Sequence, residues 1–306
     1  MCSHAPTSGV TLPDPHSDPE KVADMNEKTE LSYQYYPDPN LEYFKPDYNP
    51  TYLQRILKEG ILLATGGAAI LLQMAHPGVA QGVNEHSNFA YRPADRLRST
   101  MIYMYCIAFG TSEERKVIIE MVHRAHENVK GPGYSANDPE AQLWVAATLY
   151  AAGSHIYELM FGKQSDTDED NTYQEYSVMA TALRVSPEMW PETRKAFWAY
   201  WEENIKTLPI ESHAKQVGKN LLYNKVGPLW LRLNLPFLRV ITAEWLPPRM
   251  REAYGLRVHH RRYKLALGFG KIVYPRLPSW IRSYPLKYYL KDMRKELPKM
   301  VEVGHI

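Results

Sequence analysis

Helix start and stop signals divide the middle of this chain into apolar segments of helical length. Thr111-Ser112-Glu113-Glu114 is a capping box, with Thr as the cap and Glu at the third helical position. Gly131-Pro132-Gly133 ends the segment that follows. Asp138-Pro139-Glu140 begins the next helix with a cap and then Pro, and Gly162 ends it. Because no segment shows a sustained alternation of β-branched residues, the pattern predicts an all-α fold.

Hydrophobic periodicity predicts further helices and a simple domain organisation. We expect helices over Tyr52–Met74, Pro93–Phe109, 172–183 and 187–206, and an acidic loop over Asp166–Asp170. Residues 225–290 contain many prolines, which predicts short helices laid across the body. Residues 1–50 contain eight prolines and are expected to be largely irregular. Residues 51–306 should form a single helical domain of about eight or more helices, packed as densely as a globin, with a proline-rich, basic C-terminal wrap.

Charge is distributed unevenly between the two parts of the chain. Residues 1–214 contain 17 basic and 29 acidic residues, and residues 215–306 contain 19 basic and 5 acidic residues. A basic region of this kind suits nucleic acid, an anionic membrane or an acidic group. No nucleic-acid motif accompanies it, so we expect no nucleic-acid partner. A contact with the acidic part of the chain, or peripheral contact with lipid head groups, is the preferred interpretation.

Targeting signals and cysteine usage indicate where in the cell the protein is expected to lie. The first residues lack a basic region followed by an apolar core, so no secretory signal is expected. The uncharged stretch Gly60–Ala75 has 16 residues, fewer than the ~20 needed to span a bilayer. Two cysteines, Cys2 and Cys106, cannot form a disulfide framework. These features predict an intracellular, cytoplasmic protein without a transmembrane segment.

Histidines are the most informative candidates for chemistry, and two of them lie in one predicted helix. At about 100° per residue, His126 lies about 20° from Ile119 and should point inward. His123 lies on the other side, beside Lys116 and other charged residues, and should face water. A buried neutral imidazole needs a partner for each ring nitrogen, which can be a metal ion or a backbone carbonyl. The sequence leaves both alternatives open for His126.

Two further histidines and a polar helix face add candidates. His76 and His86 lie ten residues apart at the end of a predicted buried helix, where they either border a cavity or cap helix ends. Arg96 and Thr100 lie one turn apart on one helix face. A guanidinium and a hydroxyl in this arrangement suit a carboxylate or a bound oxygen, and the alternative is a solvated helix face.

Several other chemistries lack their motifs. Glu120-x-x-His123 is half of a ferritin-like di-iron motif, and no second copy exists. His-Glu-x-x-His, the Walker loop, Gly-x-Gly-x-x-Gly and Gly-x-Ser-x-Gly are also absent from the sequence. Hydrolase and nucleotide-binding functions are therefore not indicated.

A series of segments resembles one known family. The segments occur in the order HPGVAQGVNEHSNF, RPADRLRST, HRAHENVKG, YSANDPEAQLWVAATL, FG and MWPETRKAFWAYW. Together they resemble the family named after the catalytic domain of rubber oxygenase (latex-clearing protein) and the oxygenase of mycophenolic acid biosynthesis. The resemblance covers roughly residues 50–250, and it is greatest to the short soluble members of the family.

The resemblance implies an all-α fold that holds a b-type haem, with a histidine as the iron ligand. The family's ligand matches His126, in His126-Glu127-Asn128-Val129. The distal Arg-x-x-Lys-Thr arrangement of rubber oxygenase matches Arg96 and Thr100, with Ser99 in place of the lysine. His86 lies near the region of that enzyme's catalytic glutamate and is expected to move a proton.

The remaining expectations follow from the same resemblance. His76 and Arg96 are expected to bind the cofactor, and Arg257, Arg261 and Arg262 are candidates to neutralise the haem propionates. The implied function is haem-dependent oxygenation of a hydrophobic small molecule, such as a terpenoid or polyketide intermediate of secondary metabolism. Dioxygen or peroxide and an external electron donor are the expected co-reactants. The alternatives are a haem protein with peroxidase-like or non-oxygenating chemistry, and a helical carrier of haem or a lipophilic ligand.

Overall fold

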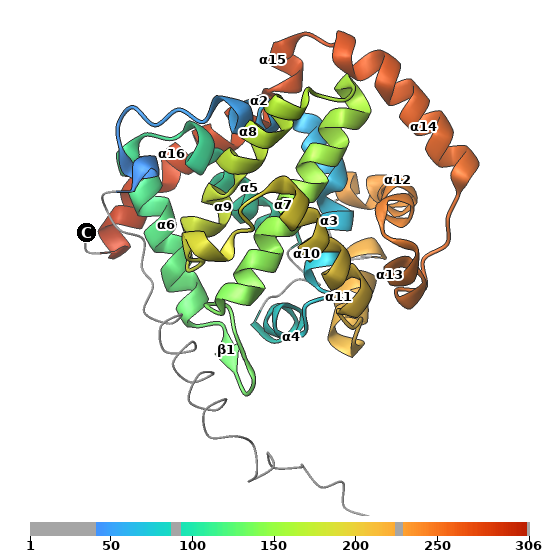
Figure 1. The fold of residues 1–306 in the computed structure, drawn as a ribbon, viewed down its shortest axis with the longest axis horizontal. Helices are drawn as coiled ribbons and strands as arrows, with labels where there is room; N and C mark the ends of the chain where they lie inside the picture. The colour runs from blue at the N-terminus through green and yellow to red at the C-terminus, as the bar shows by residue number, and fades with distance from the viewer. Residues whose placement is uncertain (1–40, 87–92, 224–228, 305–306) are drawn as a thin grey trace, which may run out of the picture.

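The computed structural model describes residues 41–86, 93–223 and 229–304, and nearly all of their regular structure is helical. The chain forms a single helical domain, as the sequence predicts. Helix α7 (Pro139–Phe161) runs through the middle of the body (Figure 1). It buries residues on every side, among them Trp144, Ala147 and Tyr150. A helix that is apolar all round takes a central position because its whole surface must be removed from water.

Three helices predicted from capping and periodicity are confirmed. Helix α5 covers Pro93–Phe109, α6 covers Ser112–Glu127, and α7 follows the cap Asp138. The capping box of Thr111 and Glu114 is formed in both directions. A two-residue hairpin, β1 (Lys130–Gly131) with β2 (Tyr134–Ser135), joins α6 to α7. The sequence therefore determines these helix ends locally.

The predicted helix over Tyr52–Met74 is wrong, because it is broken at Gly60. Helix α2 (Thr51–Leu57) is followed by the 3-10 helix η2 (Gly60–Thr65) and by α3 (Gly66–Gln73), and the chain bends by 66° at the break. A Cβ atom on Gly60 would lie 2.8 Å from the carbonyl oxygen of Arg282. The break thus lets the C-terminal segment approach the backbone closely.

No single helix in the described ranges is both long enough and apolar enough to cross a membrane. Only α2 taken together with the segment Gly60–Gln73 reaches that length and composition, as a bent pair.

The predicted acidic loop at Asp166–Asp170 is also wrong, because these residues begin helix α8 (Asp166–Tyr176). The hydroxyl of Ser165 accepts a hydrogen bond from the backbone N–H of Asp168 and caps the helix. Carboxylates in the first turn are stabilised by the helix dipole. The expected helices at 172–183 and 187–206 are correspondingly shifted, to α8, α9 (Val178–Thr181), η3 (Pro187–Met189) and α10 (Arg194–Thr207).

Long helices also form in the proline-rich region, contrary to the prediction of short ones. Helix α12 (Leu229–Trp245) has 17 residues and contains Pro236 at an exposed position, and α14 (His260–Val273) has 14 residues. The other C-terminal elements are α13 (Pro248–Ala253), η4 (Tyr274–Arg276), α15 (Ser279–Arg282) and α16 (Tyr284–Gly304). The prolines mostly lie at helix starts, where they are tolerated.

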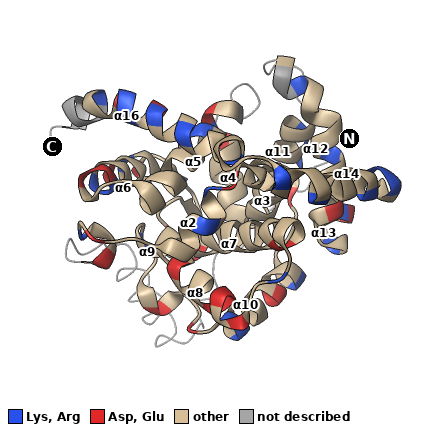
Figure 2. Ribbon diagram, turned by 90° about the horizontal axis from the view of Figure 1, so that it is seen from above, with Lys and Arg blue, Asp and Glu red and all other residues tan. Residues whose placement is uncertain are grey.

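The C-terminal segment wraps the body as expected, and ion pairs attach it. Arg282 donates to the buried carboxylate of Glu59 at 2.7 Å, and Tyr274 donates to the other oxygen of the same carboxylate. Arg294 on α16 makes two hydrogen bonds to Glu114 on α6. Lys and Arg gather along α14 and α16, whereas many Asp and Glu lie on α8 and α10 (Figure 2). The charge asymmetry of the sequence is therefore also an asymmetry between faces.

Candidate functional site

Helices α5, α6 and α7 pack so that Arg96, the predicted distal arginine, lies close enough to His126, the predicted iron ligand, to affect its charge. His126, on the last turn of α6, is half-buried, and Arg96 is half-buried on the first turn of α5. Burial, His123, Arg96 and Arg184 together lower the pKa of His126 to about 4. His126 is therefore neutral at neutral pH, with two arginine side chains close enough to act on its charge.

The helical projection predicted that His123 faces water, and this prediction is wrong. Only 2% of its surface is exposed, although the sequence placed it towards water. The buried face of α6 follows the row Arg115, Ile119 and His123, because Arg115 turns inward and donates to the carbonyl oxygens of Gly110 and Lys45. His123 and His126 therefore both turn inward.

Gln142, on the first turns of α7, orients the imidazole of His126. Its Nε2 atom lies 3.3 Å from Nδ1 of His126 and donates to the carbonyl oxygen of Ala136 at 2.7 Å. Its Oε1 atom accepts from the backbone N–H of Arg184 at 2.8 Å. These partners fix the amide orientation, so Gln142 donates towards Nδ1 of His126. In neutral His126 the proton then resides on Nε2.

Thr100 lies one turn after Arg96 and borders a small cavity. Its hydroxyl donates to the carbonyl oxygen of Arg96 at 3.0 Å. The cavity has a volume of ≈ 60 Å³, room for about two water-sized molecules. Its lining is mostly apolar and comes from η2, α3, α5 and α7, including Leu97, Met101 and Gly153. A cavity of this size and lining suits a small apolar molecule such as dioxygen.

His86 forms a short hydrogen-bond chain at the exposed end of α4 (Pro77–His86). Its Nε2 atom lies 2.9 Å from the hydroxyl oxygen of Tyr134, and that hydroxyl donates to Glu85 at 2.6 Å. The hydrogen bond to Glu85 raises the pKa of Tyr134 to about 12. Since the Tyr134 proton points to Glu85, the Tyr134 oxygen accepts from Nε2–H of His86. The chain can hold a proton close to residues 87–92, which lie outside the described ranges.

His76 lies between α3 and α4, apart from the His126 neighbourhood. Burial lowers its pKa, and its charged neighbours are Asp138 and Glu140 rather than Arg96 or Arg184. In the described residues no three His, Cys, Asp or Glu side chains are grouped as a metal site requires. His76, His86 and His126 therefore do not share a metal site.

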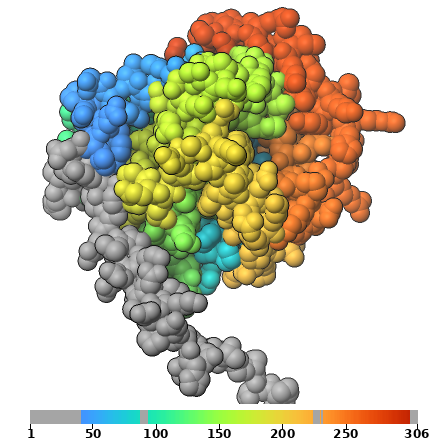
Figure 3. Space-filling model, viewed as in Figure 1, coloured from blue at the N-terminus to red at the C-terminus, as the bar shows by residue number. Residues whose placement is uncertain are grey.

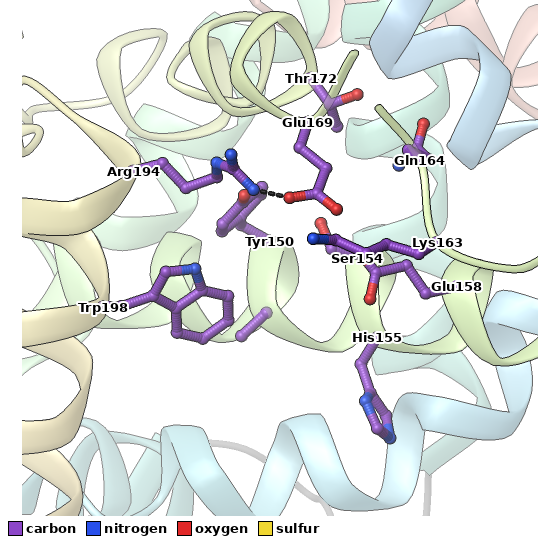
Figure 4. Close-up of a pocket in the computed structure, with 11 residues that line it drawn as sticks. Tyr150, Ser154, His155, Glu158, Lys163, Gln164, Glu169, Thr172, Arg194 and Trp198 are labelled. Carbon is purple, nitrogen blue, oxygen red and sulfur yellow. Dashed lines mark ion pairs between the residues drawn. The ribbon is translucent and has the colours of Figure 1, made fainter. Parts of the chain in front are cut away.

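A second, larger cavity lies elsewhere, between α7, α8 and α10 (Figure 4). It has a volume of ≈ 230 Å³ and is lined by Tyr150, Ser154, His155 and Trp198, among others. Arg194 forms an ion pair with Glu169 across it. None of the predicted site residues borders this cavity.

Two residues of the His126 neighbourhood were missed by the sequence analysis, Gln142 and Arg184, and His123 was placed towards water instead of inward. Nothing in the local sequence marks Gln142 or Arg184, because their role depends on the packing of α7 and of the segment after α9 against α6. The arginines Arg257, Arg261 and Arg262, which the sequence offered for anionic groups, are exposed beside or on α14. Arg96 and Arg184 are the arginines that act on His126.

The structure thus combines an all-α domain with a half-buried, neutral histidine whose pKa is lowered by burial and by the charges of Arg96 and Arg184. Residues 53–273 match the model of the catalytic domain of the ER-bound oxygenase mpaB/B' and rubber oxygenase, and the chain belongs to this family. The family is one of oxygenase catalytic domains, which use oxygen and a small-molecule substrate.

Two curated proteins are similar to the chain over most of its length. They are uncharacterized proteins of Mycobacterium bovis and Mycobacterium tuberculosis, each 32% identical over 242 residues. The match covers 74% of this chain and 94% of each relative. No solved structure matches the chain.

The family resemblance implies a haem b, and the neutral imidazole of His126 with two arginines nearby is a donor set of the kind that such a cofactor would need. A haem iron takes a neutral imidazole as its protein ligand, and His126 is neutral because of burial and its arginine neighbours. In this structure Gln142 donates towards Nδ1 of His126, so the ring proton lies on Nε2. An iron held at Nε2 would require the proton on Nδ1, and the Gln142 amide would then no longer donate to that atom. Arg96 and Arg184 supply positive charge for anionic groups.

Proposed function

We propose that this protein is a haem b-dependent oxygenase that acts on a hydrophobic small molecule, with His126 as the iron ligand. The observation that supports this proposal most directly is the depressed pKa of His126, about 4, in a neighbourhood that also contains Arg96. A solvent-exposed histidine would be partly protonated near neutral pH and would ligate iron less well. Membership of an oxygenase family supplies the reaction class.

The side chains around His126 have distinct roles in this proposal. When bound, the haem iron supplies the redox chemistry that oxygen activation requires. Arg96 provides a fixed positive charge and N–H donors, which act strongly because burial screens them less. The hydroxyl proton of Thr100 is engaged by the carbonyl of Arg96, so Thr100 offers a lone pair and a methyl group to the small cavity. His86, Tyr134 and Glu85 hold a proton at the exposed side.

Haem loading of the His126→Ala variant tests the ligand assignment. Purified apo-protein is titrated with haemin, and the Soret band and the iron content per chain are measured. We expect His126→Ala to lose stoichiometric haem binding, because the variant removes the imidazole proposed to hold the iron.

His155→Ala is the control, because His155 lines the separate cavity of Figure 4 and lies apart from the residues around His126. This variant should retain haem. Full haem occupancy in His126→Ala would refute the assignment. A wild-type protein that binds no haem but binds a lipophilic ligand would favour the carrier function instead.

A further inference from the structure

The C-terminal helices expose large apolar side chains that a globular protein normally buries. Leu229, Leu233 and Phe237 recur on one face of α12, with Leu233 70% exposed. Leu265, Phe269 and Ile272 do the same on α14, with Leu265 76% exposed. None of the 14 residues of α14 is buried. We call these six side chains, together with Trp280 on α15, the apolar C-terminal surface.

The apolar face of α14 is exposed although the opposite face of the helix packs against the body of the protein. On its inner face the hydroxyl of Tyr263 accepts a hydrogen bond from the indole N–H of Trp245 at 2.8 Å. A Cβ atom on Gly270 would lie 3.8 Å from Met160 on α7, in ordinary contact. Since the helix already packs against the body through Tyr263 and Gly270, Leu265 and Phe269 are left for something else. An apolar patch on this scale marks an interaction site.

Charge around this surface identifies its occupant. Residues 253–291 contain nine Lys and Arg and no Asp or Glu. On α14, the exposed Lys264 and Lys271 lie along one margin of the apolar face at helical spacing, and the exposed Arg261 lies at its N-terminal end. Apolar and aromatic side chains flanked by basic ones are typical of helices that lie in the head-group region of a membrane. The segments from α12 to α15 occupy one side of the molecule (Figure 3).

We propose that α12, α14 and α15 dock this protein peripherally on an anionic lipid bilayer. Leu265, Phe269 and Trp280 enter the boundary between head groups and acyl chains, while Lys264 and Lys271 contact anionic head groups. A second copy placed face to face would bring two surfaces of the same sign together, which is unfavourable. The proposal does not depend on haem or on the oxygenase function.

Vesicle sedimentation with the full-length chain tests this docking. The probes are vesicles of phosphatidylcholine alone and of phosphatidylcholine mixed with phosphatidylglycerol. We expect binding to the anionic vesicles, weakened by added salt. The double variant Leu265→Ser/Phe269→Ser should lower the affinity at least about a hundredfold, because it removes two apolar side chains that each contribute ~1.5 kcal/mol or more when buried. Both side chains are exposed, so the variant should keep the wild-type circular dichroism spectrum and melting temperature.

Substitution of two lysines on α14 provides the second test of membrane docking. Lys264→Gln/Lys271→Gln should lower affinity for anionic vesicles by about thirtyfold, since each basic residue near the surface contributes ~1 kcal/mol. The matched control Lys195→Gln/Lys206→Gln changes two exposed lysines of α10, on the acidic side, and should bind as the wild type does. Absence of binding to anionic vesicles would overturn the proposal. So would a dimer, seen by light scattering, that Leu265→Ser/Phe269→Ser abolishes, because the occupant would then be a second copy.

Discussion

Gln142 and His126 face each other across the junction of α6 and α7, with 3.3 Å between Nε2 of the amide and Nδ1 of the imidazole. The same amide satisfies the carbonyl of Ala136 and the backbone N–H of Arg184. One side chain therefore joins the end of α6, the start of α7 and the segment after α9. The orientation of His126 depends on a tertiary contact rather than on its own helix.

Replacing Gln142 by Leu should destabilise the protein. Leu leaves a partly buried carbonyl and a partly buried N–H without partners, which costs about 1–3 kcal/mol. The free energy of unfolding from urea titration measures the effect. Gln174→Leu is the control, because Gln174 is exposed and bonds only the carbonyl of Glu192, and it should cost less than about 0.5 kcal/mol. Equal losses in the two variants would contradict the role given to Gln142.

Arg96→Gln should leave haem bound and slow oxygen consumption by the haem-loaded protein. Removal of one preorganised donor in a buried site lowers a rate by about 10²-fold. The same change should raise the pKa of His126 in the haem-free protein, because the Arg96 charge is one of the factors that lower it. Oxygen uptake with ascorbate as reductant and an NMR titration measure the two effects.

The control for Arg96 is its neighbour Arg98, which forms an ion pair with Asp292 on α16 at 2.5 Å. Arg98→Gln should leave both the oxygen uptake and the pKa of His126 at their wild-type values. Wild-type turnover in Arg96→Gln would exclude Arg96 from the chemistry.

Gly60 and Gly66 offer a matched pair of substitutions. A Cβ atom at Gly60 would lie 2.8 Å from the Arg282 carbonyl oxygen and 2.8 Å from Pro285, so Gly60→Ala should cost about 1–3 kcal/mol. At Gly66 nothing lies within 4 Å of an added Cβ atom, and the residue begins a helix. Gly66→Ala should be neutral or stabilising by up to about 1 kcal/mol. Thermal and urea unfolding distinguish the two, and a neutral Gly60→Ala would refute the close approach.

Stability should fall on acidification, in part because of His76. Burial of this half-buried side chain lowers its pKa below the ordinary value of 6.5. The unfolded chain therefore takes up a proton first as the pH falls, so the stability contributed by neutral His76 is complete above pH ~6.5 and decreases below it. His76→Gln should reduce the slope of unfolding free energy against pH between ~6.5 and 5 by up to about one proton. The exposed His259→Gln serves as control, and an unchanged slope in His76→Gln would contradict the prediction.

Capping residues in the sequence correctly predicted those helix starts that depend only on neighbouring residues. Thr111 with Glu114, and Asp138 with Pro139, mark helix starts that the structure confirms, because a cap needs only its own first turn. The break at Gly60 could not be predicted, because it depends on Arg282 and Pro285, more than 200 residues away in sequence. The inward position of His123 was missed for a similar reason.

The candidate site was predictable only in part. His126 and Arg96 were found from helical geometry and family resemblance, and the structure brings their charges together. Gln142 and Arg184 carry no local signal, since an isolated glutamine or arginine on a helix or in a loop is most often a surface residue. The exposed apolar face of α14 was also hidden, because its leucines and phenylalanine suggest a core helix when only the sequence is considered.

The visible absorption spectrum of the purified full-length protein, with a pyridine haemochrome assay and iron quantitation, tests the central claim most directly. The account predicts a Soret band and about one b-type haem per chain, lost in His126→Ala and retained in His155→Ala. A protein that remains colourless and iron-free after haemin is supplied would contradict it.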